Sequence, residues 1–191
     1  MIQLHQLKQG DPEWHKLREG LYTGSNAHKL LKFGAIDYSL TEASNFRGNF
    51  HTRRGHVLED EAIELYEQIK KTKGFRFPDG EKVGFVTNSK FPTCGYSPDD
   101  LYPDRTIEVK AFEEAKHMQM FNGEIPLTVL AQCYFGMLIC DKKICDLLIY
   151  NPALDPKKYT VKEMFKIITI KQKPLIKANF IRRLKPKEVA V

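Results

Sequence analysis

Residues 97–101 read SPDDL, and after a short turn residues 107–110 read IEVK. Side chains alternate between the two faces of a β-strand, so Glu108 and Lys110 point to the same face of their strand. A hairpin between the two segments can bring Asp99, at the end of the earlier strand, beside that face. We therefore expect two carboxylates and one ammonium group to converge on one point.

Such a group of side chains has a clear chemical use. Carboxylates without a neighbouring Cys or His form a site of hard oxygen ligands, which suits Mg²⁺ or Mn²⁺. The charged Lys110 cannot be a ligand there. It can orient or deprotonate a water, or neutralise charge on a phosphorane-like transition state. The alternative is a surface hairpin with an ordinary salt bridge between Glu108 and Lys110.

A third carboxylate, Glu59, lies upstream on a helix predicted over residues 54–71. Its neighbours offer a second explanation, because an acidic, solvated helix face would look the same. Those neighbours are Asp60, Glu61, Glu64 and Glu67. The joint occurrence of Glu59 with Asp99 and Glu108 favours the site.

Hydrophobic periodicity and turn signals give the order of elements around this group. Helices are predicted over residues 11–20, 23–34, 54–71, 113–121, 126–140 and 174–184. Strands are predicted over residues 82–87, 93–97, 106–110 and 144–150 and within 160–170, while residues 34–52 have weak periodicity and are expected to be loop with a short helix. This order predicts an α/β (α+β) fold in which a central mixed sheet is flanked by helices, as one domain over residues 1–191.

Composition limits the function further. The 191 residues include four cysteines in no metal-binding spacing, so buried free thiols in a reducing cytosol are expected. Neither a membrane span nor a secretory signal is expected. Residues 155–191 hold 11 Lys and Arg against three acidic residues, while the rest of the chain has 19 basic and 21 acidic residues. A basic tail beside an acidic body suits a protein that holds a polyanion and uses metal ions on it, although a solvated tail is the simpler explanation.

The residues resemble a known family. Asp99, Glu108 and Lys110 are spaced like the PD-(D/E)xK nuclease signature, and most of the chain resembles the lambda-exonuclease or YqaJ-like viral recombinase group. The resemblance is carried by QGDPEWHKLR at residues 9–18 with Gly20, TGS at 23–25, Gly55 with Glu59, SPD at 97–99, EVK at 108–110 and AQ at 131–132. It implies a restriction-endonuclease-like core.

The resemblance also implies a role for each catalytic position. Asp99 and Glu108 would be the principal metal ligands, joined by the backbone carbonyl of Val109 and, directly or through water, by Glu59. Lys110 would position or activate the attacking water. One further residue, Gln132, would sit beside the metal site and the scissile phosphate, the alternative being a buried glutamine bonded to backbone.

Three further positions, Arg18, Ser25 and Ser97, match those that form a 5′-phosphate pocket in such exonucleases. An arginine fork binds phosphate bidentately, and a hydroxyl at a helix N-terminus adds a donor where the helix dipole favours an anion. The alternative for Arg18 is a helix-end cation. Trp14, the only tryptophan, is expected to pack the first helix onto the core.

The resemblance thus implies a Mg²⁺-dependent deoxyribonuclease, with Mn²⁺ able to substitute. It would degrade linear double-stranded DNA from 5′-phosphorylated ends, 5′ to 3′, in phage-type recombination within the cytoplasm of a bacterial host. Relatives often work beside a single-strand annealing protein, and the best-known ones form a ring trimer. The open alternatives are an endonuclease of the same superfamily and a non-catalytic DNA-end-binding module, while iron–sulfur relatives are disfavoured by the cysteine spacing.

Two departures from the family pattern stand out. Asp100 replaces a glycine often found after Ser-Pro-Asp, and its carboxylate could bind metal or reach solvent. The chain is also shorter than the best-known relatives, with a brief region after its last strand.

Overall fold

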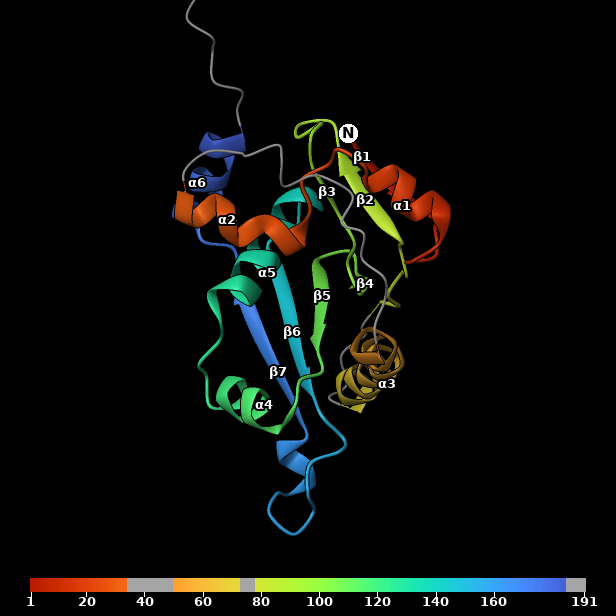
Figure 1. The fold of residues 1–191 in the computed structure, drawn as a ribbon, viewed down its shortest axis with the longest axis vertical. Coiled ribbons are helices and arrows are strands. Elements are labelled where there is room, and N and C mark those ends of the chain that lie inside the picture. The colour runs from red at the N-terminus through yellow and green to blue at the C-terminus, as the bar shows by residue number, and fades with distance from the viewer. Residues whose placement is uncertain (34–49, 73–77, 185–191) are drawn as a thin grey trace, which may run out of the picture.

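A four-stranded mixed sheet runs through the centre of the molecule, and a three-stranded antiparallel sheet lies at one end of it (Figure 1). The computed structural model describes residues 1–33, 50–72 and 78–184, apart from the side chains of residues 32–33 and 50–56. The strands are β1 (Ile2–His5), β2 (Phe85–Asn88), β3 (Gly95–Tyr96), β4 (Asp100–Leu101), β5 (Arg105–Lys110), β6 (Ile144–Tyr150) and β7 (Phe165–Lys171).

The helices lie around these sheets. They are α1 (Pro12–Arg18), α2 (Ala27–Phe33), α3 (Phe50–Thr72), α4 (Glu114–Phe121), α5 (Leu127–Ile139) and α6 (Pro174–Leu184), with short 3₁₀ turns η1 (Gly24–Asn26) and η3 (Val161–Glu163). The central sheet has the order β4-β5-β6-β7, in which only β5 and β6 are parallel. Parallel neighbours need a crossover, and the chain makes it through α4 and α5.

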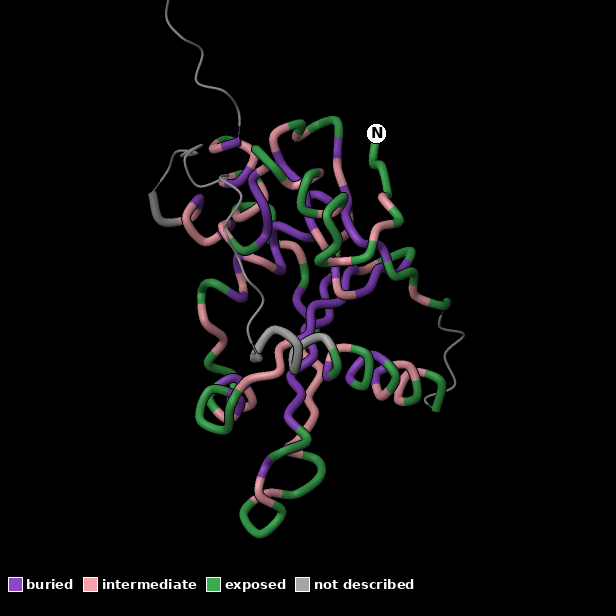
Figure 2. Tube along the Cα trace, turned by 45° about the vertical axis from the view of Figure 1, so that its right-hand side comes forward, coloured by how far each residue is buried: buried purple, intermediate pink, exposed green. Residues whose placement is uncertain are grey.

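Helices cover both faces of the central sheet. Alternation along β6 turns Leu148 toward the apolar cluster with α3, and turns Leu147 and Ile149 toward the larger cluster that contains most of α5. β5, β6 and α5 are accordingly largely buried, while β1, the outer side of α3 and the loop after β6 are largely exposed (Figure 2). The same alternation places Glu108 on the α5 side of β5 and its neighbours Ile107 and Val109 on the α3 side.

The predicted architecture is confirmed, and several boundaries agree well. The strand over residues 144–150 and the helix over residues 174–184 match β6 and α6 residue for residue. Most of the irregular segment expected over residues 34–52 lies outside the described residues. The four cysteines are buried and free, as expected. No helix in the described ranges has the length and apolar character needed to cross a membrane.

Some strand predictions were wrong. The strand expected over residues 93–97 is only Gly95–Tyr96 and belongs to the smaller sheet, so the partner of β5 is the two-residue β4. The strand expected over residues 82–87 begins at Phe85, after Gly84, where an added Cβ would lie 1.8 Å from the Leu7 carbonyl oxygen. The sequence did not predict β1, because it becomes a strand only by pairing with β2 more than 80 residues away.

A buried carboxylate ties α3 to the sheet. Asp146 on β6 is fully buried and accepts hydrogen bonds from Tyr66 (2.6 Å), Arg105 (2.8 Å) and Thr169 (2.6 Å), with Lys70 at 3.5 Å. Burial alone would raise the pKa of Asp146, but these hydrogen bonds more than offset it and hold the pKa below its usual value. Charge and hydrogen bonding therefore stabilise the packing of the helix that carries Glu59.

We expect Asp146→Asn to lower the free energy of unfolding at pH 7 by about 3 kcal/mol, because it removes the buried anion that Arg105 and Lys70 contact and leaves Arg105 with the more exposed Asp104. The folded-state pKa is depressed, so this stability is present above the unfolded pKa of about 3.9 and is lost as pH falls through the folded value. Urea unfolding at pH 7 and pH 3 measures both effects, with the exposed Asp79→Asn as control. An equal difference between parent and variant at both pH values would contradict this account.

Candidate active site

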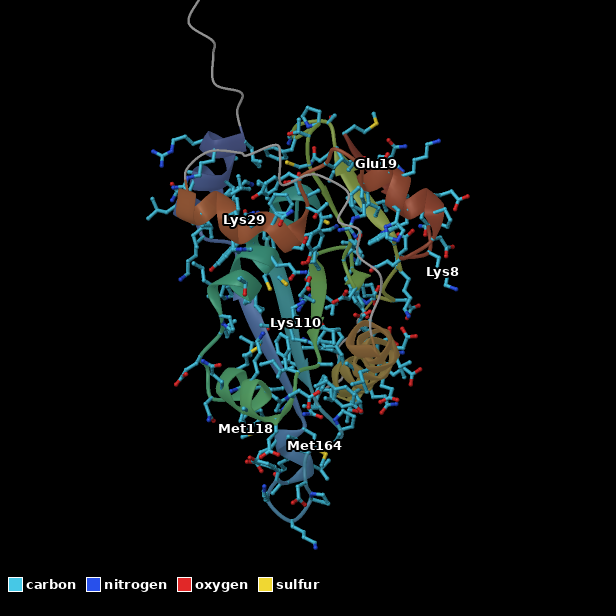
Figure 3. The ribbon with its side chains drawn as sticks, in the orientation of Figure 1. Lys8, Glu19, Lys29, Lys110, Met118 and Met164 are labelled. Carbon is cyan, nitrogen blue, oxygen red and sulfur yellow. The ribbon has the colours of Figure 1, made fainter. Side chains whose placement is uncertain are left out.

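One cavity of about 860 Å³ gathers the functional residues selected from the sequence. It opens between α1, η1, α3, α5 and β5, and Lys110 lies near the middle of the molecule beside β5 (Figure 3). The selected residues that line it are Arg18, Ser25, Glu59, Ser97, Asp99, Glu108, Val109, Lys110 and Gln132. All the candidate positions are therefore brought together, although they come from six separate parts of the chain.

The two main carboxylates are held by the hairpin between β4 and β5. Asp99 lies in the link between β3 and β4, its amide donates to the Ile107 carbonyl (3.3 Å), and its carboxylate accepts from the Val109 amide (2.6 Å). Glu108 is only 1% exposed. Burial, followed by the charges of Glu108 and Glu59, raises the pKa of Asp99 well above its usual value. A cation placed among these carboxylates would relieve that repulsion.

Lys110 contacts Glu108 across the same face of β5, as the two-residue period predicted. Burial alone would lower the pKa of Lys110, but the carboxylates of Glu108 and Asp99 outweigh it and raise the pKa above the usual value. The side chain is therefore an ammonium that donates hydrogen bonds.

The donor set fits Mg²⁺ bound partly by its substrate. In the described part of the chain, no three Asp, Glu, His or Cys side chains form a ready-made metal cage. Mg²⁺ does not need one, because it usually takes one or two carboxylates and completes its octahedron with waters and substrate phosphate oxygens. Asp99 and Glu108 supply those carboxylates, and Glu59 lines the same cavity.

Arg18, the last residue of α1, lines the same cavity. Its guanidinium carbon lies 3.8 Å from the centroid of the Trp14 ring, and burial lowers the pKa of Arg18 to about 10. Among the residues that the structure describes, none accepts a hydrogen bond from this guanidinium. A desolvated cation without an anion, facing a cavity, is suited to binding phosphate.

Trp14 supports Arg18 and does not pack into the core as predicted. All of α1 is described and none of its residues is buried. The indole N–H of Trp14 donates to the Gly84 carbonyl (3.0 Å) and to Ser97 Oγ (3.1 Å), which fixes the ring beneath Arg18. Gly84 and Ser97 are 70 and 83 residues further along the chain, so the spacing of residues in the sequence could not predict these hydrogen bonds.

Ser25 and Gln132 complete the lining. Ser25 is exposed in η1, with its Oγ 3.2 Å from Thr23 Oγ1. Gln132 is half-buried on α5, and within residues 1–33, 50–72 and 78–184 its amide makes no hydrogen bond. The alternative of a glutamine bonded to backbone is therefore not observed, and both side chains are available to a ligand.

Asp100 does not line the cavity and does not reach solvent. It is 2% exposed, lies outside the cavity, and accepts a hydrogen bond from the Leu101 amide (2.9 Å). An added Cβ at Gly80 would lie 2.1 Å from Asp100 Oδ2, so its carboxylate packs directly on that glycine. Successive residues of an extended chain point to opposite sides, which separates Asp100 from Asp99.

We expect Asp100→Asn to leave the nuclease rate and its Mg²⁺ dependence within about twofold of the parent. The neighbouring Asp99 already offers a carboxylate to the cavity, and Mg²⁺ usually takes only one or two from the protein. Burial raises the pKa of Asp100, so replacing it with a neutral amide is not expected to cost stability at pH 7. Rates measured across a Mg²⁺ titration check this. A tenfold larger Mg²⁺ requirement would assign Asp100 to the metal site.

Sequence reasoning missed several residues of the cavity wall. Tyr96, Lys8 and Gln9 line it, and Gln9 Nε2 donates to the Pro98 carbonyl (3.4 Å). Lys8 and Gln9 precede the first helix, and neither the charge pattern nor the residue spacing there indicates that they would line a cavity. Tyr96 is a strand residue of ordinary type, and only its packing shows where its hydroxyl points.

The mixed sheet presents Asp99, Glu108 and Lys110 to one cavity, which is the arrangement expected from the resemblance to PD-(D/E)xK nucleases. The chain belongs to the YqaJ-like viral recombinase domain family, whose family model matches residues 13–143. A comparison with curated proteins finds no match.

Solved structures share the fold. An alkaline exonuclease from Laribacter hongkongensis, LHK-Exo, is 18% identical with a TM-score of 0.73, and the match covers 91% of this chain and 89% of that one. The same exonuclease in complex with dAMP matches at 20% identity and a TM-score of 0.72, with the same coverage. A phage related exonuclease from Haemophilus somnus 129PT is 14% identical with a TM-score of 0.55, covering 89% of this chain and 92% of that one. The chain therefore spans most of the length of these structures.

Proposed function

We propose that this chain is one metal-dependent nuclease domain that removes nucleotides from 5′-phosphorylated ends of linear double-stranded DNA, 5′ to 3′. The observation that carries the proposal is the content of a single cavity. Two carboxylates and an ammonium line it together with Arg18, whose guanidinium has no hydrogen-bond acceptor among the described residues. Family membership and the exonucleases of similar fold support the same activity.

Metal binding would fall to Asp99, Glu108, the Val109 carbonyl and Glu59. A bound Mg²⁺ or Mn²⁺ ion lowers the pKa of a coordinated water and neutralises charge on the phosphate and the leaving 3′-oxygen. Lys110 would donate a hydrogen bond that orients the attacking water, and its charge would stabilise the extra negative charge at phosphorus.

The amide of Gln132 would donate to the scissile phosphate from α5, which fits an amide that has no partner in the described protein. This side chain and Lys110 would then contact the reacting phosphate from two different elements. Fixed donors of this kind hold a phosphate in one orientation before the reaction begins.

Polarity would follow from the phosphate pocket. Arg18, Ser25 and Ser97 would hold the terminal 5′-phosphate, which places the next phosphodiester toward the carboxylates in the same cavity. One exonuclease of similar fold was solved in complex with dAMP, a mononucleotide of the kind that such cleavage would release. An endonuclease would have no use for a pocket that takes a free chain end.

The resemblance also predicts the location, the partner and the oligomeric state of the enzyme. From the resemblance alone, we propose that it acts in a bacterial cytoplasm, works with a single-strand annealing protein and forms a ring trimer. The basic tail as a contact for the DNA backbone also stays a prediction. Its described part extends from the loop after β6 to α6, and no basic residue in that part lines the cavity (Figure 1).

End-labelled duplexes test the polarity. With Mg²⁺ present, a label at the 5′-phosphate is expected to appear as mononucleotide in the first turnovers, while a 3′ label stays in long fragments until late. Early release of the 3′ label would contradict the assigned direction.

A further inference from the structure

Tyr96 fills a closed slot behind the catalytic carboxylates. Its side chain is 1% exposed, and two glycines make room for its ring. An added Cβ at Gly24 would lie 2.8 Å from Tyr96 Cε2, and one at Gly136 would lie 2.5 Å from Tyr96 Cζ and 2.8 Å from its hydroxyl oxygen. Because η1 and α5 approach the ring this closely, the ring has one position.

The hydroxyl of Tyr96 points at Glu108. It donates to Glu108 Oε2, while Lys110 donates to Glu108 Oε1. Each oxygen of the carboxylate therefore has one donor, and the plane of the carboxylate is fixed by both. A buried hydrogen bond to a charged group is among the strongest that proteins make. A tyrosine hydroxyl ordinarily keeps its proton at neutral pH and can donate to a carboxylate.

We propose that Tyr96 is a positioning residue, which holds Glu108 in the orientation that binds the metal ion and so sets the affinity of this enzyme for its metal. The inference rests on the proposed function, because it requires Glu108 to be a metal ligand. Groups that bond to a metal ligand typically contribute 10- to 100-fold in metal affinity or activity. Gly24 and Gly136 contribute to the same positioning of Glu108, since their lack of side chains leaves room for the Tyr96 ring.

The Tyr96 ring also supports η1, the element that carries Ser25 of the proposed phosphate pocket. Gly24, which packs on the ring of Tyr96, directly precedes Ser25 in η1. A single rigid ring therefore lies between the element that carries Ser25 and the strand that carries Glu108. The distance between a bound chain end and the metal ligands is fixed in part by Tyr96.

The test is metal binding by Tyr96→Phe, which removes one oxygen and keeps the ring. Tyr102→Phe is the matched control, because Tyr102 is also 1% exposed and donates to a glutamate, Glu67 (3.1 Å), that lies outside the cavity. Calorimetric titration of the DNA-free proteins with Mn²⁺ is expected to show about 10- to 100-fold weaker binding for Tyr96→Phe and no change for Tyr102→Phe. Equal Mn²⁺ affinity of Tyr96→Phe and the parent would overturn the proposal.

Kinetics separate positioning from a general loss of structure. The Mg²⁺ concentration for half-maximal rate is expected to rise by the same factor in Tyr96→Phe, while kcat at saturating Mg²⁺ and KM for DNA stay within about threefold. A fall in kcat that saturating Mg²⁺ does not restore, with Mn²⁺ affinity unchanged, would contradict a role through the metal.

A second variant keeps the test decisive if Tyr96→Phe does not fold. Gly136→Ala retains the hydroxyl but displaces the ring, so it is also expected to weaken Mn²⁺ binding, and unchanged binding in this folded variant would contradict the proposal. A parent protein that digests no linear DNA in Mg²⁺ or Mn²⁺ would instead overturn the proposed function itself.

Discussion

Glu108→Gln is expected to lower the rate of DNA digestion by at least about a hundredfold, since it removes the charge of a principal metal ligand while keeping the shape of the side chain. The fold should survive, because the amide still offers an oxygen to Tyr96 or Lys110, the two groups that hold Glu108 in the parent. Lys110→Ala should give a loss of similar size, because Lys110 is the cation that contacts Glu108 directly.

The measurement is the release of acid-soluble nucleotide from linear duplex in Mg²⁺, with DNA binding measured separately in EDTA. Glu67→Gln is the matched control, because Glu67 also accepts a hydrogen bond from a buried tyrosine but lies outside the cavity. Digestion at the parental rate by both Glu108→Gln and Lys110→Ala would show that the site assignment is wrong.

The second large effect is expected from Arg18→Ala, which should abolish the preference for 5′-phosphorylated over 5′-hydroxyl ends. Hydrogen bonds to a charged group contribute about 1.5–3 kcal/mol, so the ratio of the two rates should fall by roughly 10- to 150-fold. Arg18→Lys should restore only part of it, because an ammonium cannot grip phosphate with a planar fork. The rate on hydroxyl ends should change little, since those ends never used the arginine.

Paired duplexes that differ only in the terminal phosphate measure this ratio. Arg182→Ala on the exposed side of α6 controls for the loss of one positive charge, and it should keep the parental ratio. A parent protein that digests both kinds of end equally would remove the basis for assigning Arg18, Ser25 and Ser97 to a phosphate pocket.

Local rules predicted the parts of the site that depend on local geometry. The two-residue period of a strand is enough to place Glu108 beside Lys110, and a hairpin is enough to bring Asp99 near them. The helix over residues 174–184 follows from a proline start and an amphipathic pattern. The residues for binding a chain end came from resemblance, and the structure places them around the same cavity.

Long-range packing decided what the sequence could not predict. β1 is a strand only because it pairs with β2. Trp14 lies outside the core, where its indole N–H donates to the Gly84 carbonyl and to Ser97. The slot for Tyr96 depends on Gly136, a helix residue 40 positions away. No spacing rule connects such residues, since their contact results from the way α5 lies on the sheet.

The central claim is that this cavity is a metal-dependent nuclease centre that acts on DNA ends. Digestion of 5′-phosphorylated linear duplex beside closed circular DNA of the same sequence, each with Mg²⁺ and with EDTA, tests it most directly. We predict that only the linear DNA with Mg²⁺ is degraded to nucleotides. Linear DNA that survives in Mg²⁺, digestion that continues in EDTA, or circular DNA cut as fast as linear DNA would contradict the claim.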